Sequence, residues 1–475
     1  EHIERAGIDY TVPHMFAGSI LDLNIGTEYE ARFTMEDPDG LGGEAVKLVN
    51  VSTRAEPKAY REGRVRHVYP EYYTGEKEEP SYPGLVSAYG GSHNTKGDWY
   101  VVGEDPVQPG DIIKIHAGLY RGDLLNYPDW HNIPFDGTYW FTEKGTAERP
   151  IVIEAAGDGE VIFDGAGATN LFNVMASDHH IFQNLTFRNV DRVFEAGRKH
   201  LAGASNLTVR NCRFEMVGEA LRTEYAGSKN FLIHDNVIIG REDRFRVFGW
   251  AASRKGTIPY GTHLLDSYYG VKVYGSGHVI AYNSIAYFHD GIGISTYGTP
   301  EEEQDLKAVS IDIYNNDIHL MVDDFVEADG GVHNIRIMRN RGVNTAQSGI
   351  SIQPLFGGPA YYIRNVLYNI PPDGGVLKIH GGCPGLTIYH NTFIAENNGG
   401  SGHPNSNYRN NLFLGSDGPT YVARFPYTST YSIADYNGYR PNQGPDSPED
   451  QYRWLSFDDG KMVGFKTLKE LSKAS

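Results

Sequence analysis

The segment Leu386-Thr387-Ile388-Tyr389-His390-Asn391-Thr392 carries the pattern that decides the fold. Aliphatic residues alternate with polar ones, as they do in a short strand with one buried face, and an asparagine follows directly. A strand this short cannot bury its apolar face alone. The segment therefore predicts a structure in which many copies of one unit stack on one another.

Asparagine recurs in the same setting through the middle of the chain. The copies are Gln183-Asn184-Leu185, Arg210-Asn211-Cys212, Asp235-Asn236-Val237, Tyr282-Asn283-Ser284, Asn315-Asn316-Asp317, Arg339-Asn340-Arg341, Arg364-Asn365-Val366, His390-Asn391-Thr392 and Asn410-Asn411-Leu412. Their period is about 25 residues, which leaves no room for an ordinary helix and predicts a coil of parallel strands, a β-helix. The two longest intervals hold Arg241–Tyr269 and Thr299–Ala308, rich in charge, Gly and Pro, which we interpret as inserted loops.

We assign these asparagines a structural role and no chemistry. Asparagine tolerates the left-handed backbone conformation of a tight turn. Side-chain amides at one position per coil can also hydrogen-bond to their copies above and below. The repeat thus predicts an asparagine ladder along one corner of the β-helix.

Two further motifs are His289-Asp290-Gly291-Ile292 and the segment Asp323–Gly331, DDFVEADGG. With the Asn-x-aliphatic repeats, they resemble the right-handed parallel β-helix proteins of the pectin-lyase-like superfamily, most of all the bacterial right-handed β-helix repeat group. The resemblance covers about Arg149 to Tyr439. It implies an all-β chain and a carbohydrate-active protein. It does not choose an activity, because the superfamily includes polysaccharide lyases, glycoside hydrolases, epimerases, esterases and phage tailspikes.

The N-terminal part of the chain is different. Leu21–Phe33, Asp37–Gly40 and Val51–Pro57 resemble the last strands of a fibronectin type III domain, and too few residues precede them for a whole sandwich. We therefore predict a partial β-sandwich over 1–60, a linker or flap over 61–97, the β-helix over 98–440 and a C-terminal extension over 441–475.

Composition limits the class of protein and its partners. The chain has 475 residues, 40% of them hydrophobic, and a formal net charge of −18 from 42 basic and 60 acidic residues. Such a chain can build a large core, while its charge argues against nucleic acid and anionic membrane as partners. No apolar run is long enough to span a bilayer. We expect a monomer, secreted or periplasmic, whose export signal is absent from this sequence.

The two cysteines, Cys212 and Cys383, lie several coils apart in this register. At ~4.8 Å per coil they are too distant for a disulfide, which needs Cα atoms within ~7 Å. We expect two free thiols.

The chemistry is located by aligning the best strand of each coil. These strands begin Leu171-Phe172, Phe194-Glu195, Leu221-Arg222, Val271-Lys272, Ile292-Gly293, Val326-Glu327, Ile350-Ser351 and Leu377-Lys378. First and third positions are mostly apolar and should point inward, so second and fourth positions share the outer face. The polar side chains predicted there are Glu195, Arg222, Glu224, Lys272, Tyr274, Ser295, Glu327, Asp329, Ser351, Gln353, Lys378 and His380.

Carboxylates are concentrated on this face. Six of them fall within a few coils, a span of roughly 15 Å: Glu224, Asp290, Asp323, Asp324, Glu327 and Asp329. Such a cluster is unfavourable through like-charge repulsion, and proteins keep one mainly for metal binding or acid–base catalysis.

We predict a hydrolase acting on an acidic or sulfated polysaccharide in an open groove. The catalytic residues would be Glu327, Asp329, Asp324 and Asp290, since two neighbouring carboxyl groups can divide the acid and base roles of a glycosidase. Substrate would be bound by Glu224, Arg222, Lys272, Tyr274, His289, Gln353, Lys378 and His380. This reaction requires no cofactor.

Two alternatives stay open. A polysaccharide lyase or C5 epimerase would hold Ca²⁺ on Asp323 and Asp324, oxygen ligands of the kind calcium prefers, with Lys272, Tyr274 or His380 as the base. A non-catalytic glycan-binding β-helix would instead present aromatic side chains such as Tyr274, Tyr297 and Phe356 to the sugar. We prefer hydrolysis because carboxylates outnumber candidate bases at the centre of the cluster.

Overall fold

The computed structural model describes residues 2–5, 8–11, 16–91, 103–121, 139–241, 267–294, 308–371, 374–379, 383–395, 397, 405–425, 431–455 and 461–474. No helix in these ranges is long and apolar enough to cross a membrane.

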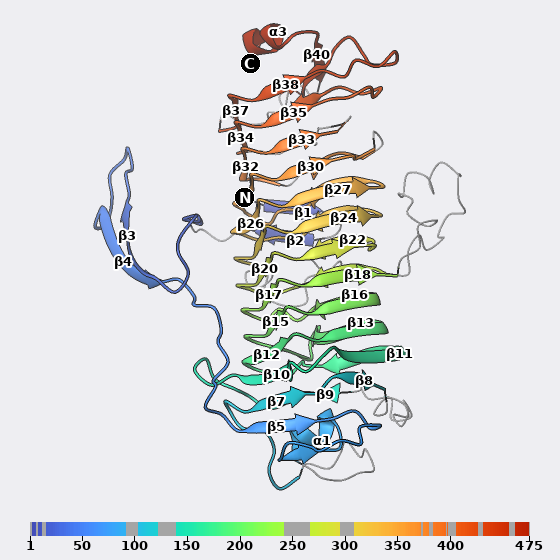
Figure 1. The fold of residues 1–475 in the computed structure, drawn as a ribbon. Coiled ribbons are helices and arrows are strands. Elements are labelled where there is room, and N and C mark those ends of the chain that lie inside the picture. Colours follow the sequence, from blue (N-terminus) through green and yellow to red (C-terminus); the bar gives the residue numbers. More distant parts are fainter. Residues whose placement is uncertain are drawn as a thin grey trace.

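The chain forms a right-handed parallel β-helix, as predicted, whose coils stack into an elongated column (Figure 1). One face is a parallel sheet made, in spatial order, of β6 (Ser81–Tyr82), β5 (Val65–Val68), β7 (Ile112–Ile115), β10 (Ile151–Ala155), β12 (His180–Gln183), β15 (Thr208–Arg210), β17 (Leu232–His234), β20 (Val279–Ala281), β23 (Asp312–Tyr314), β26 (Ile335–Met338), β29 (Ala360–Ile363), β32 (Leu386–Tyr389), β34 (Asn407–Arg409) and β37 (Ile433–Asp435).

The other strands wind around the rest of each coil. The strands after the asparagine turn are β18 (Val237–Gly240), β21 (Ser284–Ala286), β24 (Asp317–Met321), β27 (Arg341–Thr345), β30 (Val366–Tyr368), β33 (Thr392–Ile394), β35 (Leu412–Leu414) and β38 (Gly438–Arg440). The strands that later carry the site are β9 (Tyr139–Trp140), β19 (Tyr269–Lys272), β22 (Asp290–Gly293), β25 (Asp324–Glu327), β28 (Ser348–Ile352) and β31 (Leu377–Ile379). The long strands β11 (Val161–Asn173), β13 (Thr186–Arg198) and β16 (Arg213–Thr223) span both regions. Strand β8 (Gly118–Tyr120) pairs with β11 in an earlier coil and has no asparagine before it.

Short elements complete the chain. They are the hairpin β1 (His2–Arg5) and β2 (Ile8–Thr11), the hairpin β3 (Glu28–Thr34) and β4 (Val46–Ser52), α1 (Leu85–Gly90), β14 (Ala202–Gly203), β36 (Ala423–Phe425), β39 (Tyr452–Leu455), β40 (Met462–Phe465) and α3 (Leu468–Ala474).

The β-helix begins earlier than the predicted boundary at Asp98. Strand β5 pairs in parallel with β7, and Leu85, Ala88 and Tyr89 of α1 are buried in the continuous core. The described part of the predicted linker or flap (61–97), residues 61–91, therefore supplies the first strands and a helix at one end of the column (Figure 1). The repeat did not reveal them because β5 carries no asparagine motif.

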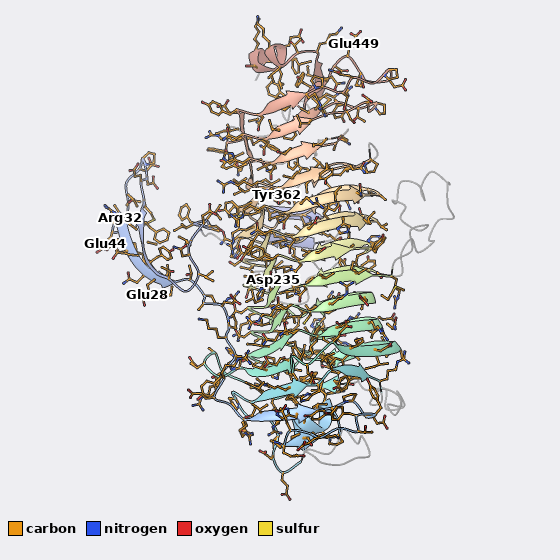
Figure 2. The ribbon with its side chains drawn as sticks, viewed as in Figure 1. Glu28, Arg32, Glu44, Asp235, Tyr362 and Glu449 are labelled. Carbon is orange, nitrogen blue, oxygen red and sulfur yellow. The ribbon has the colours of Figure 1, made fainter. Side chains whose placement is uncertain are left out.

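The segment predicted to resemble a fibronectin domain forms the β3–β4 hairpin, which stands away from the column (Figure 1). Figure 2 shows Glu28, Arg32 and Glu44 around it, far from the stacked coils. Within residues 16–60 the structure shows no second sheet layer against this hairpin. The likeness to a fibronectin domain stays a prediction. The flanking chain is tied to the column by the ion pairs Arg210–Glu56 and Arg339–Asp22, each 2.8 Å.

The asparagine ladder is present, with one correction to its register. It runs through Asn236, Asn283, Asn316, Asn340, Asn365, Asn391, Asn411 and Asn437, each of the first seven donating its side-chain amide to the next. In the two preceding coils Asn184 and Asn211 instead occupy the left-handed turn position before the ladder, with φ of 61° and 51°. Cys212 takes the ladder position, where its backbone N–H donates to Asn236 Oδ1. Both cysteines are buried free thiols, as predicted.

We expect Asn365→Ala to lower the free energy of unfolding by about 2–4 kcal/mol, since buried groups left without partners cost about 1–3 kcal/mol each. The Asn365 amide donates to Ile337 O at 2.9 Å and its Oδ1 accepts from the Asn340 backbone N–H at 3.0 Å. Urea denaturation measures the loss. The control Asn50→Ala, on the exposed face of the β3–β4 hairpin, should leave stability nearly unchanged. Equal effects of both variants would mean that the ladder contributes little.

Candidate functional site

The polar face is organised as two columns of side chains that run along the stack. Register partners in the first column are Asn170, Arg192, Glu219, Tyr269 and Asp290, and higher up Asp324 and Ser348. The second column holds Asn173, Glu195, Arg222, Lys272, Gly293, Glu327, Ser351 and Lys378. The second column reproduces the predicted alignment in every coil but the first. There Phe172, and not Leu171, pairs with Phe194. Leu171 and Phe172 are both apolar and buried, so the apolar pattern did not distinguish them.

The two columns are three residues apart on each strand, which simple alternation does not predict. In β22 both Gly291 and Ile292 are buried between Asp290 and Gly293, and in β25 Phe325 and Val326 are buried between Asp324 and Glu327. Two successive inward residues mean that the strand bends at this place. The bend brings the first column beside the second and adds Tyr269, which the sequence analysis missed.

The carboxyl groups of neighbouring coils meet in one cluster. His289 Nδ1 lies 2.9 Å from Asp290 Oδ2, and Asp290 Oδ1 accepts the backbone N–H of Asp324 at 3.0 Å. The Lys378 ammonium donates to Asp323 Oδ1 at 3.1 Å and to Asp324 Oδ2 at 3.0 Å. Asp323 and His289 are 7% and 8% exposed, whereas Asp324 is fully buried. The cluster is therefore more enclosed than an open groove predicts, since its members pack against one another as ion pairs.

Burial and the neighbouring charges shift the pKa values of the groups in this cluster. Burial, reinforced by Asp290, raises the pKa of Asp323. Burial and the neighbouring Asp323 raise the pKa of Asp324 well above its ordinary value. Burial acts to lower the pKa of His289 and Lys378, but the adjacent carboxylates outweigh it and raise both. A raised pKa favours the neutral carboxyl form that a general acid needs.

Glu327 is held by a tyrosine from two coils below. The Tyr269 hydroxyl donates to Glu327 Oε2 at 2.7 Å, and the Lys272 ammonium lies 4.6 Å from the centre of the Tyr269 ring. The ring can cross the intervening coil because Gly293 has no side chain there: an added Cβ would lie 2.6 Å from Tyr269 Cε1. Gly293 thus makes the contact between the columns possible.

We expect Gly293→Ala to displace Tyr269 and to lower catalytic activity by roughly tenfold or more, since small misplacements of catalytic groups are costly. Turnover on a cleavable substrate measures the effect. Gly159 has a positive φ, so Gly159→Ala would be strained and is a poor control. The control is Ala286→Gly in β21, which changes a single methyl group away from the site. Full activity in Gly293→Ala would show that the Tyr269 contact is dispensable.

The remaining predicted residues divide into four groups. Arg222 and Lys272 both pair with Glu224, at 2.5 Å and 3.2 Å, and extend the charged columns downward. Asp329 accepts the Ser351 hydroxyl at 2.7 Å, and Ser351 is the register partner of Glu327, so both predicted acids flank one serine. Tyr274 and Gln353 lie just after the ends of β19 and β28. Tyr274 is buried, and the buried Oε1 of Gln353 has no hydrogen-bond partner in the described part of the chain. Ser295, Tyr297 and His380 lie outside the described residues.

Tyr268, on the exposed edge of the cluster, was also not predicted from the sequence. Tyr268 is 48% exposed and stacks on His289 with ring centres 4.9 Å apart. Burial of its hydroxyl, with Asp290 nearby, raises the pKa of Tyr268 to about 12. The sequence signal for Tyr268 and Tyr269 was their place directly before the aligned strand, the place that His289-Asp290 and Asp323-Asp324 occupy in later coils.

The cluster fits calcium poorly. His289, Asp290 and Asp323 offer one ligand atom each within 4.8 Å of one another, but calcium takes six to eight oxygen ligands. The Lys378 ammonium already lies between Asp323 and Asp324, the pair to which we assigned the cation. A fixed ammonium there supplies the positive charge that the metal would bring.

No protein-family model and no curated protein matches the sequence. Among solved structures, a mutant tailspike of Escherichia coli bacteriophage HK620 in complex with a pentasaccharide is 11% identical, with a TM-score of 0.42 over 73% of this chain and 68% of the tailspike. The mannuronan C-5 epimerase A-module of Azotobacter vinelandii is 13% identical, with a TM-score of 0.42 over 71% of this chain and 90% of the module. A PL6-family alginate lyase is 13% identical, with a TM-score of 0.43, and this chain spans 53% of its length. Similarities with identities and TM-scores this low do not indicate the function of this chain.

Proposed function

We propose that the protein hydrolyses a polysaccharide at the carboxyl cluster of β22 and β25. The observation that carries the proposal is the juxtaposition of carboxyl groups in two different environments. Asp323 and Asp324 are buried beside other acids, which favours their neutral form. Glu327 accepts a hydrogen bond from a tyrosine hydroxyl, an interaction that stabilises a carboxylate as an anion.

These environments suit the two roles in glycoside hydrolysis. A neutral carboxylic acid protonates the leaving oxygen of the glycosidic bond, while an ionised carboxylate activates water or attacks the sugar. Asp323 is the better acid because it retains some exposure, whereas Asp324 is fully buried. Glu327, with Asp329 near it across Ser351, takes the ionised role.

Elimination is less well supported because raised pKa values keep Lys378, Tyr268 and Tyr269 in their protonated forms. Ion pairing raises the pKa of Lys378, and burial raises the pKa of Tyr268 to about 12 and that of Tyr269 further. Lys272 lies 3.2 Å from a carboxylate oxygen of Glu224. A base that removes the C5 proton of a uronic acid must first be free of its proton.

Partly exposed cations support an acidic or sulfated substrate. Arg222 has 28% and Lys378 has 19% of its side chain exposed, and the half-exposed Tyr268 stacks on His289. Sugar rings stack on tyrosine, and anionic groups on the sugar pair with guanidinium and ammonium groups.

The first experiment is incubation with a panel of acidic and sulfated polysaccharides, with and without EDTA. New reducing ends, no ultraviolet absorbance from unsaturated uronates and no effect of EDTA are the expected results. Appearance of the unsaturated chromophore would identify a lyase, and a loss of activity with EDTA would show that a metal is needed.

The pH dependence provides a second test. Because Asp323 acts as an acid, the rate should fall as the pH rises through its raised pKa. Asp323→Asn should lower the rate by about 10²–10⁴-fold and remove this alkaline limb, while the exposed control Asp317→Asn keeps both rate and profile. A rate that rises steadily with pH would instead indicate a basic catalyst.

A further inference from the structure

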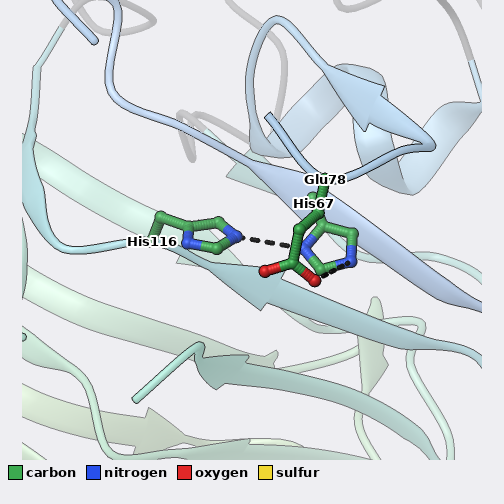
Figure 3. A group of neighbouring side chains, drawn as sticks. All are labelled: His67, Glu78 and His116. Carbon is green, nitrogen blue, oxygen red and sulfur yellow. Dashed lines mark hydrogen bonds and ion pairs between the residues drawn. The ribbon is translucent and has the colours of Figure 1, made fainter. Parts of the chain in front are cut away.

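A second cluster of potential metal ligands lies at the N-terminal end of the column, in β5, after β7 and in the segment between β5 and β6. Two imidazole rings approach each other there, with His67 Nδ1 3.0 Å from His116 Nε2. Glu78 Oε2 lies 3.7 Å from His67 Nε2. Figure 3 shows the two rings edge to edge with the Glu78 carboxylate beside His67. One ligand atom from each residue lies within 4.8 Å of the others.

Each member is held in place by neighbours. His116 Nδ1 bonds to Asp158 Oδ2 at 2.7 Å, and the His116 ring stacks on Tyr69 with centres 3.8 Å apart. The Tyr69 hydroxyl in turn accepts the backbone N–H of Glu78 at 2.8 Å. His67 and His116 are 5% and 7% exposed, whereas the Glu78 side chain is 70% exposed. The rings are therefore fixed, and the carboxylate is free to turn toward them.

The proton positions decide which ring nitrogens have lone pairs to offer. A carboxylate only accepts, so His116 Nδ1 must carry its proton, and its Nε2 then presents a lone pair to His67. A neutral His67 ring has one N–H for its two neighbours, His116 Nε2 and the Glu78 carboxylate. If Nδ1 carries the proton, a lone pair on Nε2 faces Glu78. If Nε2 carries it, two lone pairs face each other at 3.0 Å.

A metal ion would replace the hydrogen bond between the two rings. With the proton on His67 Nε2, the lone pairs of His67 Nδ1 and His116 Nε2 are both available to one ion. Two nitrogens on a tetrahedral zinc ion, with Zn–N bonds of about 2.0–2.1 Å, lie roughly 3.3 Å apart. The observed 3.0 Å requires only a small separation of the rings. Asp158 would orient the ligand His116 as carboxylates commonly do for zinc-bound histidines.

We propose that His67, His116 and Glu78 bind a zinc ion, with water in the fourth position. Two imidazoles and one carboxylate are a common zinc ligand set. The ion would tie the segment from Tyr69 to Glu78 to the first strands of the β-helix. The site is separate from the carboxyl cluster in β22 and β25, so its presence does not depend on the proposed hydrolysis.

The test is zinc binding by the full chain after treatment with a chelator, measured by competition with a metal-sensitive dye. One zinc ion per chain is expected. Glu78→Gln should weaken binding at least tenfold, and this exposed position leaves the fold intact. Asp158→Asn should weaken it by about 10–100-fold, while the neighbouring exposed control Glu76→Gln should bind as the unaltered chain does.

Two results would overturn the proposal. One is the absence of stoichiometric zinc binding. The other is zinc affinity that survives Glu78→Gln and His116→Ala but disappears in His289→Ala, which would place the ion at the carboxyl cluster. A structural readout accompanies the titration: zinc should slow amide hydrogen exchange in residues 69–80 of the unaltered chain and not in Glu78→Gln.

Discussion

Glu327→Gln is expected to reduce turnover by about 10²–10⁴-fold, the usual contribution of an acid–base or nucleophilic carboxylate. The amide carbonyl of glutamine can still accept the Tyr269 hydroxyl, which donates to Glu327 Oε2 at 2.7 Å in the structure. The fold should therefore persist while the negative charge is lost. Steady-state rates on a polysaccharide that the unaltered chain cleaves measure the effect.

The matched control is Asp317→Asn. Asp317 precedes β25 in the same coil and loses the same charge, but it lies 44% exposed in an ion pair with Arg341. It should retain full activity. Asp329→Asn is the companion test, because Asp329 bonds to Ser351, the register partner of Glu327. If Glu327→Gln and Asp329→Asn both keep full activity, the site lies elsewhere.

Lys378→Met is expected to lower the free energy of unfolding by about 3–5 kcal/mol at neutral pH, as removal of one partner from a buried ion pair does. The ammonium lies 3.1 Å from Asp323 Oδ1 and 3.0 Å from Asp324 Oδ2. Without it, any carboxylate of this pair that is ionised at neutral pH is left without its cation or must take up a proton. Urea denaturation over a range of pH measures the loss.

The sign of the pH dependence follows from the raised pKa values of Asp323 and Asp324. A carboxyl group whose pKa is raised by folding contributes stability below its unfolded pKa, about 3.9, and loses it as the pH rises through the folded value. The deficit of Lys378→Met should thus be small in acid and grow toward neutral pH. Arg341→Met, which breaks an exposed pair, should cost less than about 1 kcal/mol. A deficit independent of pH would point to lost packing.

The sequence predicted the fold and the second column because their signals repeat. Asparagine at the ladder position and aliphatic residues such as Val326 and Ile350 recur in each coil, so one alignment placed Glu327 beside Ser351. The same alignment failed where two adjacent residues were both apolar and where the asparagine was missing. Leu171 and Phe172 are both apolar, which shifted one coil by a residue, and β5 has no asparagine to mark it.

The detailed chemistry of the site depends on contacts that no local pattern contains. The bend in β19 that places Tyr269 beside Lys272 cannot be predicted from a pattern in which side chains simply alternate between the two faces of a strand. Lys378, predicted to bind substrate, is engaged with Asp323 and Asp324 across two coils. His67 and His116 were passed over because they are far apart in sequence and meet only when β5 pairs with β7.

The central claim is that the carboxyl cluster adds water across a glycosidic bond. The most direct measurement is cleavage of an active polysaccharide in water enriched in heavy oxygen, followed by mass spectrometry of the products. Hydrolysis places one labelled oxygen atom in each new pair of chain ends, and Glu327→Gln should abolish the labelled product. Cleavage that yields unlabelled, unsaturated ends would contradict the account and assign the site to elimination.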